Sequence, residues 1–133
     1  MAKMKSAWIL LIFMVLPAIV WADECIEGDC VNGYGTMVYT TGQKFIGNFK
    51  DGLRHGEGVF ILLGGRKIVG VWQENEIVEG TYTMPDGTKY VGQWKYRERN
   101  GRSELIYPDG RRYVGEFKSE QRHGKGTLFF PDG

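Results

Sequence analysis

The chain has 133 residues, a length that fits one domain at most, and it combines twenty glycines with 14% aromatic residues. Every glycine follows residue 22, which predicts many tight turns between strands that carry aromatic side chains. The formal net charge is +1 and the two signs of charge are interleaved, so no nucleic-acid partner is expected, because such binders present a basic face.

Residues 1–22 have the three parts of a secretory signal peptide: two early lysines, an apolar run over 7–20, and small residues before a cleavage site. Val20 and Ala22 occupy the −3 and −1 positions of that site. An uncleaved membrane anchor is the alternative, although the run is shorter than the ~20 residues of a spanning helix. We therefore expect an exported protein of the periplasm or cell envelope, or a secreted one.

Cys25 and Cys30 are the two cysteines of the chain, and they flank the turn-forming pair Gly28-Asp29. An exported chain meets an oxidising compartment, where an even number of cysteines favours pairing. We predict a disulfide in the short segment 23–33, stabilising it by roughly 2 kcal/mol. Structural zinc would need four ligands, and a redox pair usually has two intervening residues, so both alternatives are weaker, and free thiols are a third.

A repeat of 22 to 23 residues organises the rest of the sequence. Alternation with period 2 inside each unit predicts strands. A turn, which is Pro-Asp-Gly in the later units, suits a type I turn with glycine in the left-handed position. The other, polar connections are expected to be longer solvated loops. The defining motif, aromatic-x-Gly-x-aromatic with one isoleucine exception, lies at 45–49, 68–72, 90–94 and 113–117, and Gly-x-Gly recurs at 33–35, 56–58 and 124–126.

These patterns predict an all-β fold, an elongated and curved antiparallel β-meander ribbon of about nine strands, made of tandem β-hairpin repeats after an N-terminal signal helix. Successive repeats should be displaced by roughly 10 Å, because each contributes two strands. The predicted array spans residues 34–133, with a half repeat at 31–44 and units at about 45–67, 68–89, 90–112 and 113–133.

The repeat resembles the MORN repeat (membrane occupation and recognition nexus) over about residues 31–133. The family pattern is Tyr-x-Gly-x-Trp/Phe-x-x-Gly-x-x-x-Gly-x-Gly, then a strand and a turn like Pro-Asp-Gly, and 45–65 and 113–133 match it well. Val78 and Ser103 each replace one glycine of the Gly-x-Gly element in the other units. The resemblance implies an elongated hairpin ribbon that serves as a scaffold, a targeting module, or a dimerisation or lipid-associated element.

No convergent catalytic set is visible in the sequence. His55 and His123 occupy equivalent Arg-His-Gly positions three repeats apart, roughly 30 Å at ~10 Å per repeat. Ser103 takes a repeat glycine position, and the Pro-Asp-Gly aspartates serve turns. We therefore expect no enzyme activity, cofactor, metal site or small-molecule substrate. An exported hydrolase, the minor alternative, would need convergent groups in one cleft.

Two surfaces are candidates for binding. The aromatic residues of the first strands should form a stripe that is either the core of a thin ribbon or a partly open groove for an extended peptide, glycan or lipid. The sequence ends on a turn, so the last strand is an apolar edge that invites pairing, unless the chain is a fragment of a longer array. The candidate binding face comprises Phe45, Phe49, Trp72, Tyr90, Trp94, Tyr113 and Phe117, and the candidate association edge comprises Leu128, Phe129 and Phe130.

The repeats, the export signal and the missing catalytic set predict a non-enzymatic protein-interaction or scaffolding module of the cell envelope, with a protein partner or self-association. A membrane-surface or lipid-binding module is the alternative. It is weakened because removal of residues 1–22 leaves 15 basic and 16 acidic residues, whereas anionic lipids attract basic clusters. A short signal sequence leading directly into a small array favours a bacterial source.

Overall fold

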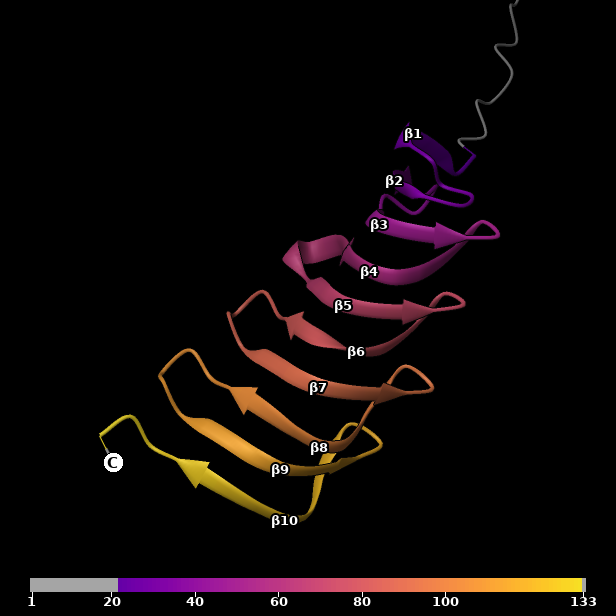
Figure 1. Ribbon diagram of the computed structural model, residues 1–133. Coiled ribbons are helices and arrows are strands. Elements are labelled where there is room, and N and C mark those ends of the chain that lie inside the picture. The colour runs from indigo at the N-terminus through magenta and orange to yellow at the C-terminus, as the bar shows by residue number, and fades with distance from the viewer. Residues whose placement is uncertain (1–21, 133) are drawn as a thin grey trace, which may run out of the picture.

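In the computed structural model, residues 22–132 are described, and they form one antiparallel sheet of ten strands in chain order (Figure 1). The order confirms the predicted all-β meander of tandem hairpins. The strand beyond the expected nine is β1, which the disulfide-bearing segment forms and which the repeat pattern does not predict. The predicted signal peptide and its helix lie, apart from Ala22, outside the described residues.

The strands are five to nine residues long, and one short 3-10 turn interrupts them. Within residues 22–132 no helix is long and apolar enough to cross a membrane. The elements are β1 (Glu24–Gly28), β2 (Tyr34–Val38), β3 (Lys44–Lys50), β4 (Leu53–Ile61), η1 (Leu63–Gly65), β5 (Lys67–Gln73), β6 (Glu76–Thr83), β7 (Lys89–Lys95), β8 (Glu98–Ile106), β9 (Arg112–Lys118) and β10 (Gln121–Phe129).

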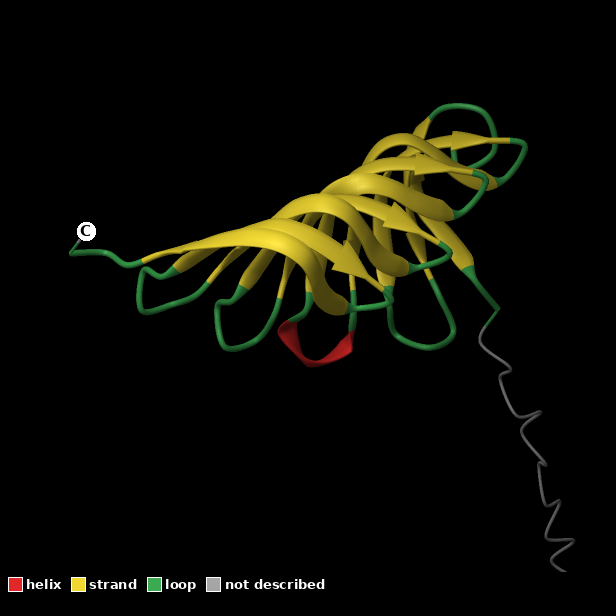
Figure 2. Cartoon of the chain, turned by 90° about the horizontal axis from the view of Figure 1, so that it is seen from below, coloured by secondary structure: helices red, strands yellow, loops and turns green. Residues whose placement is uncertain are grey.

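The sheet is strongly curved, so that the strands arch over one face (Figure 2). Arg54 and Phe60 lie six residues apart on β4, a separation of about 20 Å in a straight strand. The Arg54 guanidinium carbon nevertheless lies 4.4 Å from the centre of the Phe60 ring. The strand therefore bends toward the face of the sheet that carries Arg54 and Phe60. We call this face the aromatic face.

The bend coincides with a β-bulge in each second strand. In β4, Gly58 pairs with Gly47 and Arg54 pairs with Phe49, so residues 55–57 lie opposite Asn48 alone. β8 and β10 repeat this shift, whereas β6 has a single extra residue. Because extra residues bend the bulged strand and increase its twist, each unit curves in the same sense.

The connections between strands of one unit differ from the long solvated loops that the sequence predicts. Each is a two-residue turn, and the polar residues after it belong to the next strand. Both turn residues have positive φ, as in a type I′ turn, at 52° and 75° for Asp51-Gly52 and at 52° and 64° for Tyr96-Arg97. The prediction was wrong because three of the four turns lack the usual Asn-Gly or Asp-Gly pair.

The Pro-Asp-Gly connections behave as predicted. Gly87 and Gly110 of the Pro-Asp-Gly turns both have φ of 88°, the left-handed conformation that glycine adopts without strain. Asp109 accepts the backbone N–H of Arg111 at 3.0 Å, and these local bonds hold its pKa below the ordinary value. The turns therefore set the register in which successive units pair.

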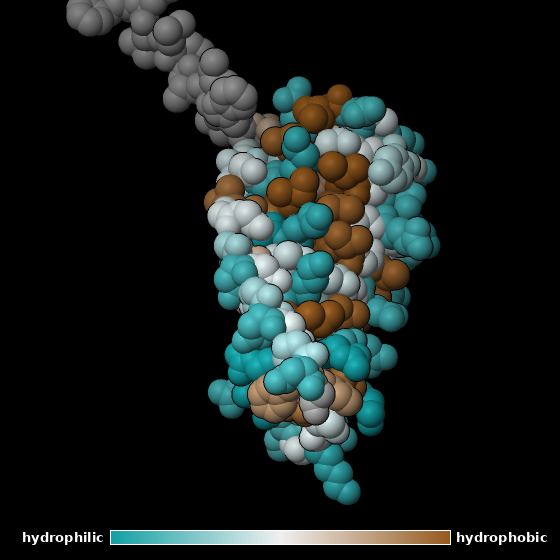
Figure 3. Space-filling view, turned by 90° about the vertical axis from the view of Figure 1, so that its left-hand side faces the viewer, coloured by the Kyte–Doolittle hydropathy of each residue, from teal (hydrophilic) through white to brown (hydrophobic). Residues whose placement is uncertain are grey.

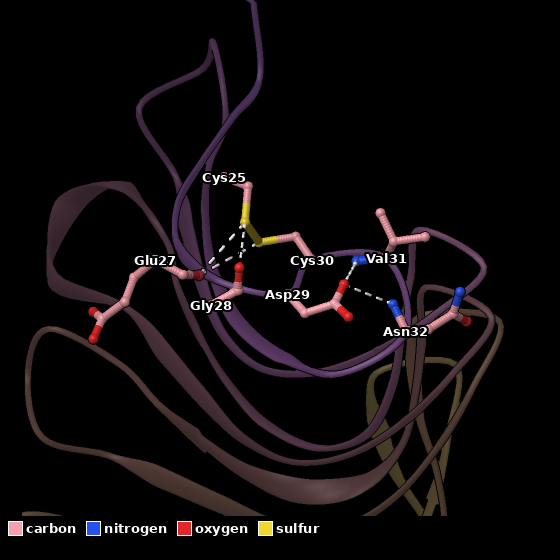
Figure 4. The surroundings of a disulfide bond; sticks show 7 residues. All are labelled: Cys25, Glu27, Gly28, Asp29, Cys30, Val31 and Asn32. Carbon is pink, nitrogen blue, oxygen red and sulfur yellow. Dashed lines mark hydrogen bonds between the residues drawn. A yellow bond between two sulfur atoms is a disulfide. The ribbon is translucent and has the colours of Figure 1, made fainter.

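The disulfide is formed between Cys25 and Cys30, as predicted, and joins β1 to the turn that follows it (Figure 4). Cys30 is buried against the first aromatic cluster. Asp29 accepts the backbone N–H groups of Val31 and Asn32 at 2.9 and 3.0 Å, and these bonds lower its pKa. The segment is thus a compact cap on the first repeat.

Candidate functional site

The seven aromatic residues of the candidate binding face lie together on the aromatic face, and six of them are buried. Phe45 and Tyr90 have no exposed surface at all. Neighbouring rings meet edge to face, at 5.2 Å for Phe45–Phe49 and 5.0 Å for Tyr90–Trp94. The stripe is therefore the core of the ribbon, one of the two interpretations that the sequence left open, and it presents little ring surface to a ligand.

A row of glycines supports these rings from below. Gly47, Gly58 and Gly70 pair with one another across β3, β4 and β5. A β-carbon on Gly58 would lie 2.6 Å from Cε2 of Phe45, which is closer than atoms can approach. Gly58 is therefore required by ring packing, whereas a β-carbon on Gly70 would meet the backbone of Glu79 and Gly80, so the close approach of paired strands requires glycine there.

A hollow of about 450 Å³ opens on the aromatic face over the middle strands. Its floor includes Trp72 and the half-buried Trp94. One wall is the turn between β2 and β3 with Tyr39, and the other is formed by the two-residue turns that contain Asn75 and Arg97. We call it the central hollow. Residues from both ends of the strands line it, because the strands curve around it.

Arg54 is the central cation of this hollow. Its guanidinium carbon lies 4.4 Å from the ring centre of Phe60 and 4.8 Å from that of Trp72, within reach of cation–π attraction. Its Nη2 donates to the backbone carbonyl of Asn75 at 2.9 Å, and its backbone N–H donates to Oδ1 of the same residue. The buried Nε–H has no acceptor among the described residues.

Burial lowers the pKa of Arg54 below its ordinary value, and the charge of Arg97 acts in the same direction while Tyr39 and Glu76 oppose it. Burial also raises the pKa of the Tyr39 hydroxyl, against the effect of the Arg54 charge. Both shifts follow from the partial removal of the guanidinium and the hydroxyl from water. A cation in that position gains from an anionic partner.

Trp94 supplies a second unsatisfied donor. The indole N–H of Trp72 reaches the carbonyl of Gly58 at 3.4 Å, whereas the buried indole N–H of Trp94 has no acceptor in the described part of the chain. The two tryptophans hold equivalent positions in successive units. The bulge of β6, which pairs with the strand of Trp94, is one residue shorter than that of β4.

Arg54 is the site residue that the sequence interpretation missed. Arginine recurs five residues after the second aromatic position of three units, at 54, 99 and 122, and Ile77 takes that place in the fourth. Each of these arginines curls over the rings of its unit, at 5.5 Å for Arg99 and Tyr90. The sequence shows this spacing, but a solvated loop was expected there, so the arginines were not predicted to lie over the rings.

The remaining candidate residues do not converge. His55 lies on β4 and His123 on β10, with five strands between them in the sheet. Ser103 is buried on β8 beside Tyr90. Among residues 22–132, no group of three or more histidine, cysteine, aspartate or glutamate side chains is placed to hold a metal ion.

Exposed apolar residues occur elsewhere on the surface. Figure 3 shows hydrophobic residues gathered over the N-terminal part of the array, with hydrophilic ones on both sides. Leu63, Val69 and Val71 are 53%, 42% and 40% exposed. The residues of the candidate association edge are also exposed: Leu128, Phe129 and Phe130, at 37%, 44% and 54%.

The fold and its hollow define a class of protein, a curved ribbon of tandem β-hairpins that offers a concave contact surface. The MORN repeat is matched by five segments that together make up more than half of the chain, and the chain belongs to this family. Such repeats are generally protein- or membrane-interaction modules and are typically non-catalytic. None of the curated proteins matches the chain. The matched segments are residues 32–44, 45–62, 78–89, 90–111 and 113–133.

Proposed function

We propose that this protein is a non-enzymatic scaffolding module of the cell envelope that binds a protein partner on its aromatic face. Residues 1–22 have the features of an export signal, and the paired Cys25 and Cys30 suit an oxidising compartment. Membership of the MORN repeat family supports an interaction role. Export and the envelope location rest on the sequence pattern.

The observation that carries the proposal is the central hollow. A sheet whose aromatic side chains are locked edge to face gives a rigid floor, and a preformed surface loses little entropy on binding. The polar groups at its walls point to recognition of a polar segment rather than of lipid chains. The protein partner is therefore favoured over a membrane surface, which the near-neutral charge of residues 23–133 also disfavours.

The test combines pull-down with light scattering. Protein expressed from the full sequence is purified from the exporting host, and its mass is measured by size-exclusion light scattering alone and with envelope extract. We expect a defined complex with one polypeptide. A monomer that recovers no partner from envelope extracts, or that co-sediments equally well with liposomes of neutral and anionic lipids, would count against the proposal.

A further inference from the structure

Two units of the array place an arginine in the same position, but the residue that contacts its guanidinium differs between them. Arg54 pairs with Phe49 in β3, and Arg99 pairs with Trp94 in β7, in equivalent registers. Both guanidiniums lie over aromatic rings of their own unit. Each is approached by the second residue of the next two-residue turn, which is Asn75 in one case and Glu120 in the other.

At Arg99 the site is complete. Its Nε donates to one carboxylate oxygen of Glu120 at 2.9 Å, and its backbone N–H donates to the other at 2.8 Å. Its Nη2 also donates to the backbone carbonyl of Glu120 at 2.7 Å. The side chain of Arg99 is 16% exposed, so this ion pair is better shielded from water than a typical surface pair.

At Arg54 no carboxylate of residues 22–132 forms an ion pair. Asn75 reproduces two of the three hydrogen bonds that Glu120 accepts. Its Oδ1 accepts the backbone N–H of Arg54, and its backbone carbonyl accepts from Nη2, both at 2.9 Å. An amide carries no charge, and Nε is left without an acceptor. The backbone of the two turn residues is the same, since Asn75 and Glu120 both have φ of 71°. The two turn residues therefore differ in the length and the charge of their side chains.

The carboxylates that line the central hollow are engaged elsewhere. Both oxygens of Glu76 accept from Nε of Arg97 at 3.0 Å. Asp23 accepts the backbone N–H of Thr40 at 2.8 Å. Neither forms an ion pair with Arg54. Within the described part of the chain, Arg54 is thus a shielded cation of the hollow without a carboxylate partner, and its equivalent two units along, Arg99, is paired with glutamate.

We propose that the central hollow binds a carboxylate of an extended acidic segment in the partner polypeptide, with the Arg54 guanidinium as its counter-charge. The inference rests on the proposed function and specifies the chemistry of the partner. A glutamate-like carboxylate is favoured because the chain itself supplies one at Arg99. The half-buried ring of Trp94 offers a contact for an apolar residue beside the carboxylate, and its indole N–H, which has no acceptor among residues 22–132, offers a further donor.

The glutamate at position 120 suggests a test variant at the equivalent position 75. Asn75→Glu should place an internal carboxylate on Arg54, as Glu120 does on Arg99, and so occupy the site from within. Asn75→Gln is the matched control, since it has the same length and no charge. Arg54→Gln removes the cation. We expect the fold to be retained in Asn75→Glu, because Glu120 already occupies the same turn position with the same φ. Amide NMR spectra of each variant check this.

Binding is measured by following the indole N–H resonance of Trp94 in protein purified from the exporting host. The probes are the capped peptide acetyl-Glu-Phe-Glu-amide, its neutral counterpart acetyl-Gln-Phe-Gln-amide, and inorganic phosphate. We expect saturable shifts with the acidic peptide, at least ~tenfold weaker binding for Arg54→Gln than for wild type, and at least ~tenfold weaker binding for Asn75→Glu than for Asn75→Gln. We expect the neutral peptide to be at least ~tenfold weaker than the acidic one.

Equal binding of the two peptides, or equal affinity in Asn75→Glu and Asn75→Gln, would overturn the inference. Phosphate binding more tightly than the acidic peptide at Arg54 would overturn the assignment to a polypeptide carboxylate. A partner that is recovered by wild type and Asn75→Glu alike would refute the role of Arg54 while leaving the scaffolding function standing. Failure of every form to recover a partner would instead refute the scaffolding function.

Discussion

The hydroxyl of Tyr90 lies 2.7 Å from Oγ of Ser103, inside the second aromatic cluster. Tyr90 donates to the backbone carbonyl of Gln93 at 2.8 Å, so the Ser103 hydroxyl acts as donor to Tyr90. Glycine holds the place of Ser103 in the three other units, at 58, 80 and 126, and a β-carbon at Gly126 would clash with the Tyr113 hydroxyl. Ser103 is thus a substitution of the repeat that its tyrosine accommodates by hydrogen bonding.

Tyr90→Phe should destabilise the protein by about 1–2 kcal/mol, because it leaves the buried Ser103 hydroxyl without its partner. Ser103→Gly restores the repeat residue and should cost less than Tyr90→Phe. Urea denaturation of both variants measures the free energy of unfolding. Tyr34→Phe, at a tyrosine that is 63% exposed, is the control and should be neutral. Equal stability of Tyr90→Phe and the control would show that the buried bond contributes nothing.

Gly58→Ala should destabilise the fold by about 2–3 kcal/mol, because its β-carbon would displace the fully buried Phe45 ring. Gly52→Ala tests backbone conformation alone. Its φ is 75° with no atom near the new β-carbon, so the expected cost is roughly 1 kcal/mol. Thermal and urea unfolding compare the two. A larger loss for Gly52→Ala would contradict the role of the glycine row in ring packing.

Tyr96→Asn should stabilise the protein by about 0.5–1 kcal/mol. Tyr96 is 85% exposed and has φ of 52°, a conformation that asparagine adopts more readily than tyrosine. The substitution forfeits the contact of Lys95 with the ring at 5.4 Å, which is small at an exposed site. Chemical denaturation measures the change, and a fall in stability would mean that this ring contact outweighs the backbone strain.

Reduction of the Cys25–Cys30 disulfide should lower the free energy of unfolding by about 2 kcal/mol, since the closed loop is short. The effect should be concentrated in β1 and β2, because Cys30 packs against the first aromatic cluster. Hydrogen exchange with and without reductant locates it. Uniformly increased exchange through β7 to β10 would contradict a role confined to the start of the array.

Stability should fall as the pH is lowered below about 4, because Asp29 and Asp109 have pKa values below the ordinary 3.8 in the folded protein. The unfolded chain then binds more protons than the folded one, so their contribution is present above the unfolded pKa and lost as pH falls through the folded pKa. Asp109→Asn should make acid unfolding less steep. An unchanged acid profile would argue that the Pro-Asp-Gly carboxylate is unimportant.

Much of the fold follows from the sequence, because its landmarks repeat in phase. Alternating aromatic and glycine positions such as Tyr90 and Gly92 specify strands, and Pro-Asp-Gly specifies the turn that reverses them. The tight turns were not predictable from composition. Tyr96-Arg97 and Ser119-Glu120 lack the usual type I′ residues, and contacts from the neighbouring units, such as Arg99 with Glu120, hold the latter in place.

The candidate site was predictable in part. The aromatic stripe is where the spacing places it, but burial of Phe45 and Tyr90 depends on curvature, which strand alternation does not convey. The bulges of β4 and β8 supply that curvature and bring Arg54 and Arg99 over the rings. The strand register is needed to see that Asn75 and Glu120 occupy equivalent turn positions beside these two arginines.

Site-specific photo-crosslinking in the exporting host tests whether a polypeptide binds on the aromatic face. A photoreactive residue is placed at Thr41, which lines the central hollow, or at Glu79, which is exposed and follows the bulge of β6 outside the hollow. We expect a crosslink from position 41 to another polypeptide, weakened by Asn75→Glu, and little crosslinking from position 79. Crosslinks to lipid alone, or equal crosslinking from both positions, would contradict an interaction module that works through its aromatic face.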